Sequence, residues 1–188
     1  MPPDLQIELY KRDPFDSPEQ EAYLALARTS AVLSAQFDEL FKRQGLTQPA
    51  YNALRILRGA GPEGRSCNEV GQHLVTQVPD VTRLIDRLQA ADLATRTRST
   101  RDKRVTYVKI TPKGLALLGK LDAPVLELHR AQLGGIDKAQ LRQAIVVLAH
   151  ARELTAQLVR ELAEARGDEQ RPTANGHATE RKNAEAGC

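Results

Sequence analysis

Apolar residues recur every three or four positions along most of this chain, which is the spacing of one face of an α-helix. Three long segments show this pattern, and each has capping residues at its start. They cover residues 18–43, 112–133 and 137–165. We expect Pro124 to kink or briefly break the second segment, because proline removes one backbone hydrogen bond and crowds the preceding turn.

Two short helices are predicted after the first long one. Thr47 followed by Pro49 is a typical helix start, and apolar residues continue at helical spacing until two glycines end the segment. Ser66 and Glu69 have the spacing of a capping box, so a second short helix should cover residues 67–73.

The next helix carries its apolar residues on one face. We expect Thr76 to be its N-cap, with Pro79 in the first turn. The apolar face consists of Val81, Leu84, Ile85 and Leu88. Residues 95–104 are then rich in Thr, Arg and Ser, and residues 105–110 (VTYVKI) alternate like a β-strand.

Short helices joined by a tight turn and followed by a basic β-hairpin form the pattern of a winged helix-turn-helix. The predicted fold is therefore mainly α with a small β-hairpin wing, flanked by long dimerisation helices. A unit of this size cannot cover the apolar faces of three long helices, so a second copy of the chain should bury them as a homodimer.

The same pattern divides the chain. Residues 1–16 form an N-terminal arm without a core of its own. Residues 17–166 form the winged-helix domain with its dimerisation helices, and its DNA-binding part covers about residues 47–111. Residues 167–188 show no apolar periodicity and should be a disordered tail.

Charge is concentrated on the predicted hairpin. Residues 94–113 contain seven Lys or Arg and one acid, Asp102, a local net charge of +6 within a chain whose total is only +3. Such a patch on one small unit is typical of a protein that binds the phosphate backbone of nucleic acid. A solvated charged hairpin is the alternative explanation.

The sequence gives little sign of membrane, metal-binding or catalytic functions. The chain has two cysteines, no secretory signal and no apolar run of membrane-spanning length, so a cytoplasmic protein is expected. The four histidines lack metal-ligand spacing, and no catalytic or cofactor-binding motif is present, so we predict no metal, no cofactor and no enzyme activity. Cys67 begins a short helix, where a thiol can be activated, but packing against the core explains it as well.

Two stretches resemble the MarR family of bacterial winged-helix transcription regulators. VTRLIDRLQAADL, from Val81 to Leu93, is similar to the family's recognition-helix core, and RDKRVTYVKITPKG, from Arg101 to Gly114, resembles its wing signature. The resemblance implies a homodimer that places each recognition helix in a major groove and each wing near a minor groove. It also implies that Asp102 positions Arg104, and that Arg104 is inserted into the DNA.

The residues themselves suggest how DNA would be contacted. On the front turns of the recognition helix, Gln77, Asp80, Thr82 and Arg83 point away from its apolar face. Gln can pair with adenine and Arg with guanine or phosphate, whereas an acid repels phosphate unless it pairs with cytosine or with a neighbour such as Arg83. The phosphate or minor-groove contacts are expected from Arg96, Arg98, Arg101, Lys103 and Arg104.

The resemblance further implies an effector site. Family members often bind small lipophilic, frequently anionic aromatic molecules in a cleft between the dimerisation layer and the winged unit. The residues placed to line such a cleft are Phe37, Phe41, Tyr51 and Leu54, and core packing explains them equally well.

The leading hypothesis is thus a sequence-specific DNA-binding transcriptional regulator, a dimeric repressor released from a palindromic operator by a small-molecule effector. Its partners would be a second copy of the chain and double-stranded DNA carrying an inverted repeat. The alternatives are a winged-helix protein-interaction module and a redox-sensing regulator that acts through Cys67.

Overall fold

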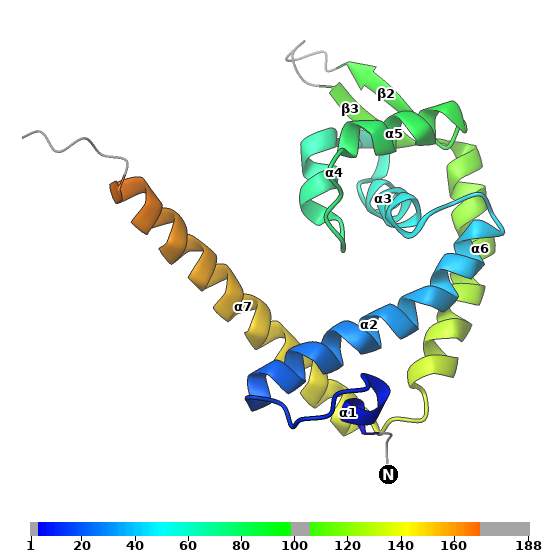
Figure 1. Cartoon of the computed structure of the whole chain (residues 1–188). Coiled ribbons are helices and arrows are strands. Elements are labelled where there is room, and N and C mark those ends of the chain that lie inside the picture. The colour runs from blue at the N-terminus through cyan, green and yellow to red at the C-terminus, as the bar shows by residue number, and fades with distance from the viewer. Residues whose placement is uncertain (1–3, 99–105, 170–188) are drawn as a thin grey trace, which may run out of the picture. The chain divides into compact units, whose positions relative to one another are not determined.

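The computed structural model describes residues 4–98 and 106–169, and these fall into two units that divide between Gly135 and Ile136 (Figure 1). The helices are α1 (Leu5–Glu8), α2 (Pro18–Lys42), α3 (Gln48–Gly59), the 3₁₀ turn η1 (Gly61–Glu63), α4 (Cys67–His73), α5 (Val81–Ala90), α6 (Pro112–Leu133) and α7 (Lys138–Glu169). The strands are β1 (Arg65–Ser66), β2 (Ala94–Arg98) and β3 (Thr106–Ile110). The mainly helical winged-helix fold expected from the sequence is confirmed.

Side-chain caps begin the helices as the sequence indicated. The Thr47 hydroxyl accepts a hydrogen bond from the backbone N–H of Ala50 at 3.3 Å, and Thr111 does the same for Gly114 at 3.1 Å. Ser66 and Glu69 form the predicted capping box. These caps satisfy N–H groups that have no partner within their helices, so they fix where each helix begins.

The predicted start of α5 is wrong. The helix begins at Val81, and its N-cap is Asp80, whose carboxylate accepts a hydrogen bond from the backbone N–H of Arg83 at 2.8 Å. Pro79 disfavours helical geometry in the residue before it, so the chain cannot easily continue a helix from Thr76 through this point. Gln77 therefore lies in the loop that precedes α5, and not on its front turn.

Three further features of the helices differ from the prediction. Helix α6 runs without a break through Pro124, because the neighbouring Leu121 and Val125 are buried and hold the helix against the core. Helix α7 continues past Gly167 to Glu169, so the predicted tail from residue 167 begins with helical residues. The arm contains the four-residue helix α1, capped by Asp4 and too short to show apolar periodicity.

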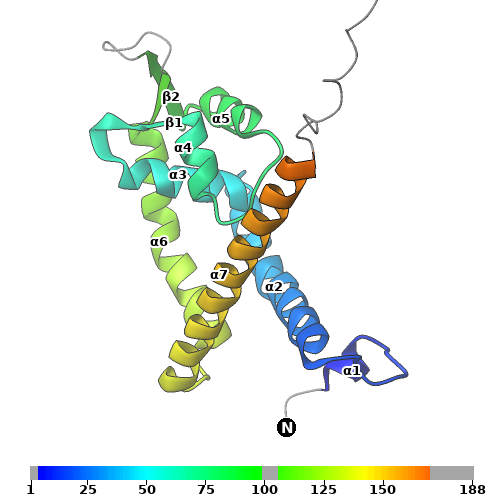
Figure 2. The same cartoon turned by 90° about the vertical axis from the view of Figure 1, so that its left-hand side faces the viewer.

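The sheet has the order β1-β3-β2 with both pairs antiparallel, and Figure 2 shows its strands beside α4 and α5. Val108 in the central strand pairs with Arg65 on one side and Arg96 on the other, and its side chain is fully buried. The two-residue strand β1 was not predicted from the sequence.

One core joins the elements of the first unit. Its largest fully buried side chains come from α3, α4, α5, β3 and α6, and they are Leu54, Leu57, Val70, Ile85, Val108, Leu118 and Leu121. The start of α6 is held very close to the start of β2: the backbone N–H of Thr111 donates to the carbonyl of Leu93 at 3.1 Å. A Cβ atom at Gly114 would lie only 2.4 Å from that same carbonyl oxygen.

We therefore expect Gly114→Ala to destabilise the fold by about 1–3 kcal/mol, as overpacking against a backbone atom does. Gly119→Ala is the matched control. Gly119 lies in the same helix, and a Cβ atom added there meets nothing within 4 Å. That control should be neutral or should stabilise by about 0.5–1 kcal/mol. Urea unfolding at one fixed protein concentration measures both, and equal effects of the two variants would contradict the close approach at Gly114.

An ion pair connects α3 to α6. The guanidinium of Arg58 donates two hydrogen bonds to the carboxylate of Asp122, at 2.8 and 2.9 Å. These same two hydrogen bonds lower the pKa of Asp122 and raise the pKa of Arg58. Both side chains are partly exposed, so we expect the pair to contribute about 0.5–1 kcal/mol.

The pair should make stability depend on pH. Because folding lowers the pKa of Asp122, its contribution is present above the ordinary pKa of an aspartate and is lost as the pH falls through the lower, folded value. Asp122→Asn should therefore lower the free energy of unfolding at pH 7, and the difference from wild type should shrink below about pH 4. Glu127→Gln, also exposed on α6, is the control; a deficit of Asp122→Asn that stayed constant with pH would exclude this cause.

Candidate nucleic-acid interface

Helix α5 presents one apolar and one polar face. Leu84, Ile85 and Leu88 are buried in the core. The outward residues are exposed, and they are Thr82, Arg83, Asp86 and Arg87. Thr82 and Arg83 lie where the sequence predicted them. Asp86 and Arg87 were not named, although their position one turn beyond Thr82 and Arg83 on the same helix could have indicated them.

Asp80 has a structural role that was not predicted from the sequence. Its carboxylate caps α5 by accepting from the Arg83 backbone, and its expected contact with DNA stays a prediction. A carboxylate in this position also interacts favourably with the positive end of the helix dipole. The loop before it, which contains the exposed Gln77, is held to α3 by a 2.7 Å hydrogen bond from the backbone N–H of Val75 to the side chain of Asn52.

The hairpin arginines differ in their surroundings. Arg98, at the end of β2, is exposed as a phosphate contact would have to be. Arg96, two residues earlier on the same face of the strand, is half-buried and forms an ion pair with Asp86 of α5. Burial alone would lower the pKa of Arg96, but the hydrogen bond to Asp86 and the charge of that carboxylate help to outweigh it and raise the pKa.

The wing tip lies outside the described residues. The roles expected for Arg101, Asp102, Lys103 and Arg104 therefore stay predictions.

The residues proposed to bind an effector form an aromatic cluster. The ring of Phe41 stacks on Tyr51 at a centroid distance of 4.3 Å and on Phe37 at 6.0 Å, and His129 of α6 lies 4.8 Å from Phe37. Phe41, Tyr51 and Leu54 are buried in the core, so the packing explanation describes their place in this structure. Their role in effector binding stays a prediction.

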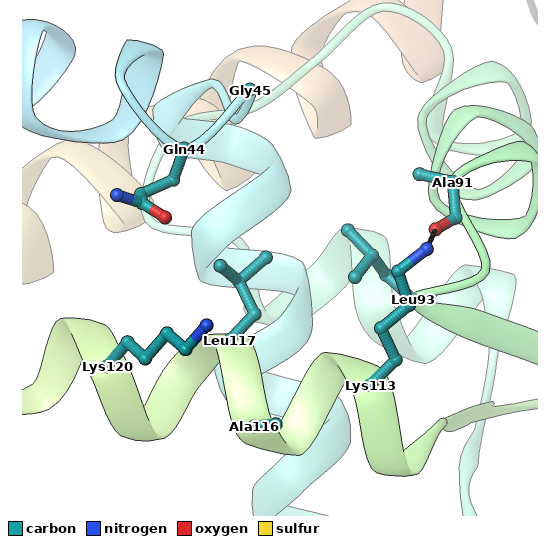
Figure 3. A pocket seen from close by; sticks show the side chains of 8 residues that line it. All are labelled: Gln44, Gly45, Ala91, Leu93, Lys113, Ala116, Leu117 and Lys120. Carbon is teal, nitrogen blue, oxygen red and sulfur yellow. Dashed lines mark hydrogen bonds between the residues drawn. The ribbon is translucent and has the colours of Figure 1, made fainter.

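An open hollow of about 450 Å³ lies elsewhere in the first unit, beside the start of α6 (Figure 3). Its lining residues are Gln44, Gly45, Ala91, Leu93, Lys113, Ala116, Leu117 and Lys120, so none of the four predicted effector residues contributes. The ammonium of Lys113 donates a 2.8 Å hydrogen bond to the carbonyl of Ala91 at the end of α5. This contact satisfies a helix C-terminus and explains the lysine without a ligand.

No helix within residues 4–98 and 106–169 is both long and apolar enough to cross a membrane. In those same residues, no three His, Cys, Asp or Glu side chains are grouped so that they could hold a metal ion.

The succession α3, α4, α5 and hairpin defines a winged helix-turn-helix, and comparisons with known proteins identify its family. The MarR family model matches residues 44–105. A solved structure, a MarR transcription factor from Planctomyces limnophilus, is 40% identical, with a TM-score of 0.56 over 72% of this chain and 98% of that one. The chain therefore belongs to the MarR family.

Two other similar proteins have more specific names. The HTH-type transcriptional repressor IacR of Pseudomonas putida is 27% identical over 118 residues, which are 63% of this chain and 70% of IacR. The structure of Bordetella bronchiseptica BpsR, described with the regulation of its DNA binding by 6-hydroxynicotinic acid, is 26% identical with a TM-score of 0.60, over 71% of this chain and 98% of BpsR.

Proposed function

We propose that this chain is a homodimeric, sequence-specific DNA-binding transcriptional regulator that acts in the cytoplasm as a repressor, and not as an enzyme. The observation that carries the proposal is the exposed face of α5, where Arg83 and Arg87 project from a helix whose other face is anchored in the core. A rigid helix with outward arginines suits the major groove, where Arg can donate two hydrogen bonds to a guanine. The exposed Arg98 suits a backbone phosphate.

Exposed apolar residues support the homodimer. In the first unit, Tyr23, Leu26 and Val32 of α2 are 71%, 47% and 54% exposed. In the second unit, one side of α7 exposes the large apolar residues Ile145, Leu148, Leu158, Val159 and Leu162. Patches of this kind usually mark an interface, and family membership points to a second copy as the partner. The dimerisation part would include α2, α6 and α7, and residues 47–111 would bind DNA.

Regulation by a small molecule is the remaining part of the proposal. BpsR, a similar protein, is described with an aromatic acid that regulates its DNA binding, and a lipophilic or anionic aromatic effector is proposed here by analogy. The protein-interaction alternative gains no support from the exposed arginines of α5. The redox alternative gains none from Cys67, which is half-buried.

DNA binding can be tested by fluorescence anisotropy with a duplex selected from a random pool and with a random duplex. Wild-type affinity should fall steeply between roughly 50 and 200 mM salt, because phosphate contacts release counterions. Arg83→Ala should cost about 1–3 kcal/mol per half-site on the selected duplex and less on the random one, if Arg83 recognises a guanine. The selected sites should be inverted repeats. Absence of binding, or binding insensitive to salt, would refute the proposed function.

The homodimer can be tested with two sets of α7 variants in sedimentation velocity. Ile145 and Leu158 are 63% and 53% exposed in the single chain, so replacing both by Asn would cost an isolated protomer little. In the proposed dimer these side chains are buried, and the double variant should shift the protein toward monomer. Val146→Asn is the control, since Val146 is 66% exposed but lies off that face of the helix. An unchanged dimer in the double variant would place the interface elsewhere.

A further inference from the structure

The guanidinium of Arg96 joins three elements of the winged unit. One nitrogen, Nη1, donates to the carboxylate of Asp86 on α5. The other, Nη2, donates to the backbone carbonyl of Thr82 on α5 at 3.4 Å and lies 4.0 Å from the sulfur of Cys67 on α4. A strand arginine that was expected to reach phosphate thus uses both terminal nitrogens of its guanidinium for contacts within the protein.

These contacts complete the attachment of α5 to the hairpin. The C-terminal end of the helix is tied to β2 by the chain itself, through a short turn in which the backbone N–H of Leu93 donates to the carbonyl of Leu88 at 2.8 Å. Thr82 belongs to the first turn of α5, so Arg96 holds the opposite half of the same helix. Because α5 is attached to the hairpin both at its C-terminal turn and through Arg96, it is restrained from rotating about the turn that links it to β2.

The pair also changes the charge of the α5 surface. Asp86 is 54% exposed, and it lies one turn beyond Thr82 on the face that carries Arg83. An unpaired carboxylate there would repel DNA phosphates, at a cost that grows as water leaves the interface. Pairing with Arg96 gives the two side chains a net charge of zero, so the outward charge of α5 is left to Arg83 and Arg87.

We propose that Arg96 is a positioning residue for DNA recognition, which fixes α5 to the hairpin and neutralises Asp86 and does not itself contact phosphate. This inference rests on the proposed DNA-binding function. An arginine is required because its planar fork satisfies the Asp86 carboxylate and the Thr82 carbonyl at once, which a lysine ammonium on a flexible chain cannot do in the same geometry.

The salt dependence of binding separates positioning from phosphate contact. Arg96→Ala should weaken binding to the selected duplex by about tenfold, the effect of losing a hydrogen bond to a charged group, while the slope of log affinity against log salt stays at the wild-type value. Arg98→Ala, on the same strand face and exposed, is the matched control and should flatten that slope by about one unit per subunit. A slope flattened equally by Arg96→Ala would overturn the inference.

Removing the partner charge gives a second and independent test. If Asp86 anchors Arg96, Asp86→Asn should lower the ratio of affinities for the selected and random duplexes, because α5 loses its fixed orientation while Arg96 gains freedom to bind any phosphate. If Asp86 were only a repelling charge, the variant should bind both duplexes more tightly with an unchanged ratio, and that result would overturn the inference. Circular dichroism melts of each variant verify that it is folded.

Arg96→Lys keeps the test decisive if Arg96→Ala does not fold. Lysine preserves the charge, so a phosphate contact would retain both the affinity and the salt slope of wild type. Loss of affinity for the selected duplex at an unchanged slope supports positioning, and wild-type behaviour in both quantities overturns it. Failure of the proposed function itself is distinguishable, because then wild type would show no salt-dependent DNA binding.

Discussion

The position of α5 depends first on the burial of Ile85 in the core that it shares with Leu54 and Leu57 of α3 and Val108 of β3. These side chains are fully buried and come from segments far apart in the chain, so the core forms only when the helices and the hairpin are assembled together. Once Ile85 faces inward, the helical period directs Thr82, Arg83, Asp86 and Arg87 outward. The chemistry of the surface therefore follows from the register of a single apolar stripe. Gly114 adds a second constraint, since only a residue without a side chain lets α6 begin so near the Leu93 carbonyl.

Most of the fold could be predicted because its signals are local. Capping side chains act within three residues, and apolar periodicity repeats every turn, so the starts at Thr47, Ser66 and Thr111 followed directly from the sequence. The start of α5 was placed at Thr76 and is in fact capped by Asp80; the error arose because the effect of Pro79 on the residue before it was not taken into account. Strand β1 could not be predicted, because two residues carry no period and the strand exists only through pairing with β3.

The candidate site was predictable where exposure follows from helix geometry and was not where it depends on tertiary contacts. Arg83 on α5 belongs to the first kind, and Arg87 could have been added by the same reasoning. Arg96 and Arg98 look equivalent in the sequence, two arginines on one strand face, yet only the first lies beside Asp86. That difference depends on how α5 crosses the hairpin, which is set by the shared core and by no local pattern. The aromatic residues Phe41 and Tyr51 show the same limit, because their spacing suits a ligand cleft and a stacked core equally well.

The net charge of the hairpin overstates its capacity to bind phosphate for the same reason. Of the seven basic residues between positions 94 and 113, Arg96 is paired with Asp86, and Lys113 satisfies the carbonyl of Ala91 at the end of α5. Both use their charge to hold the recognition helix, one near each end, and only residues such as Arg98 present theirs to the surroundings. A basic patch of this kind therefore combines two functions: some cations provide the attraction to DNA, and others keep fixed the helix that recognises its sequence. If the second group makes no phosphate contacts, as we propose for Arg96, the salt dependence of binding reports on the first group alone, whereas sequence discrimination depends on both.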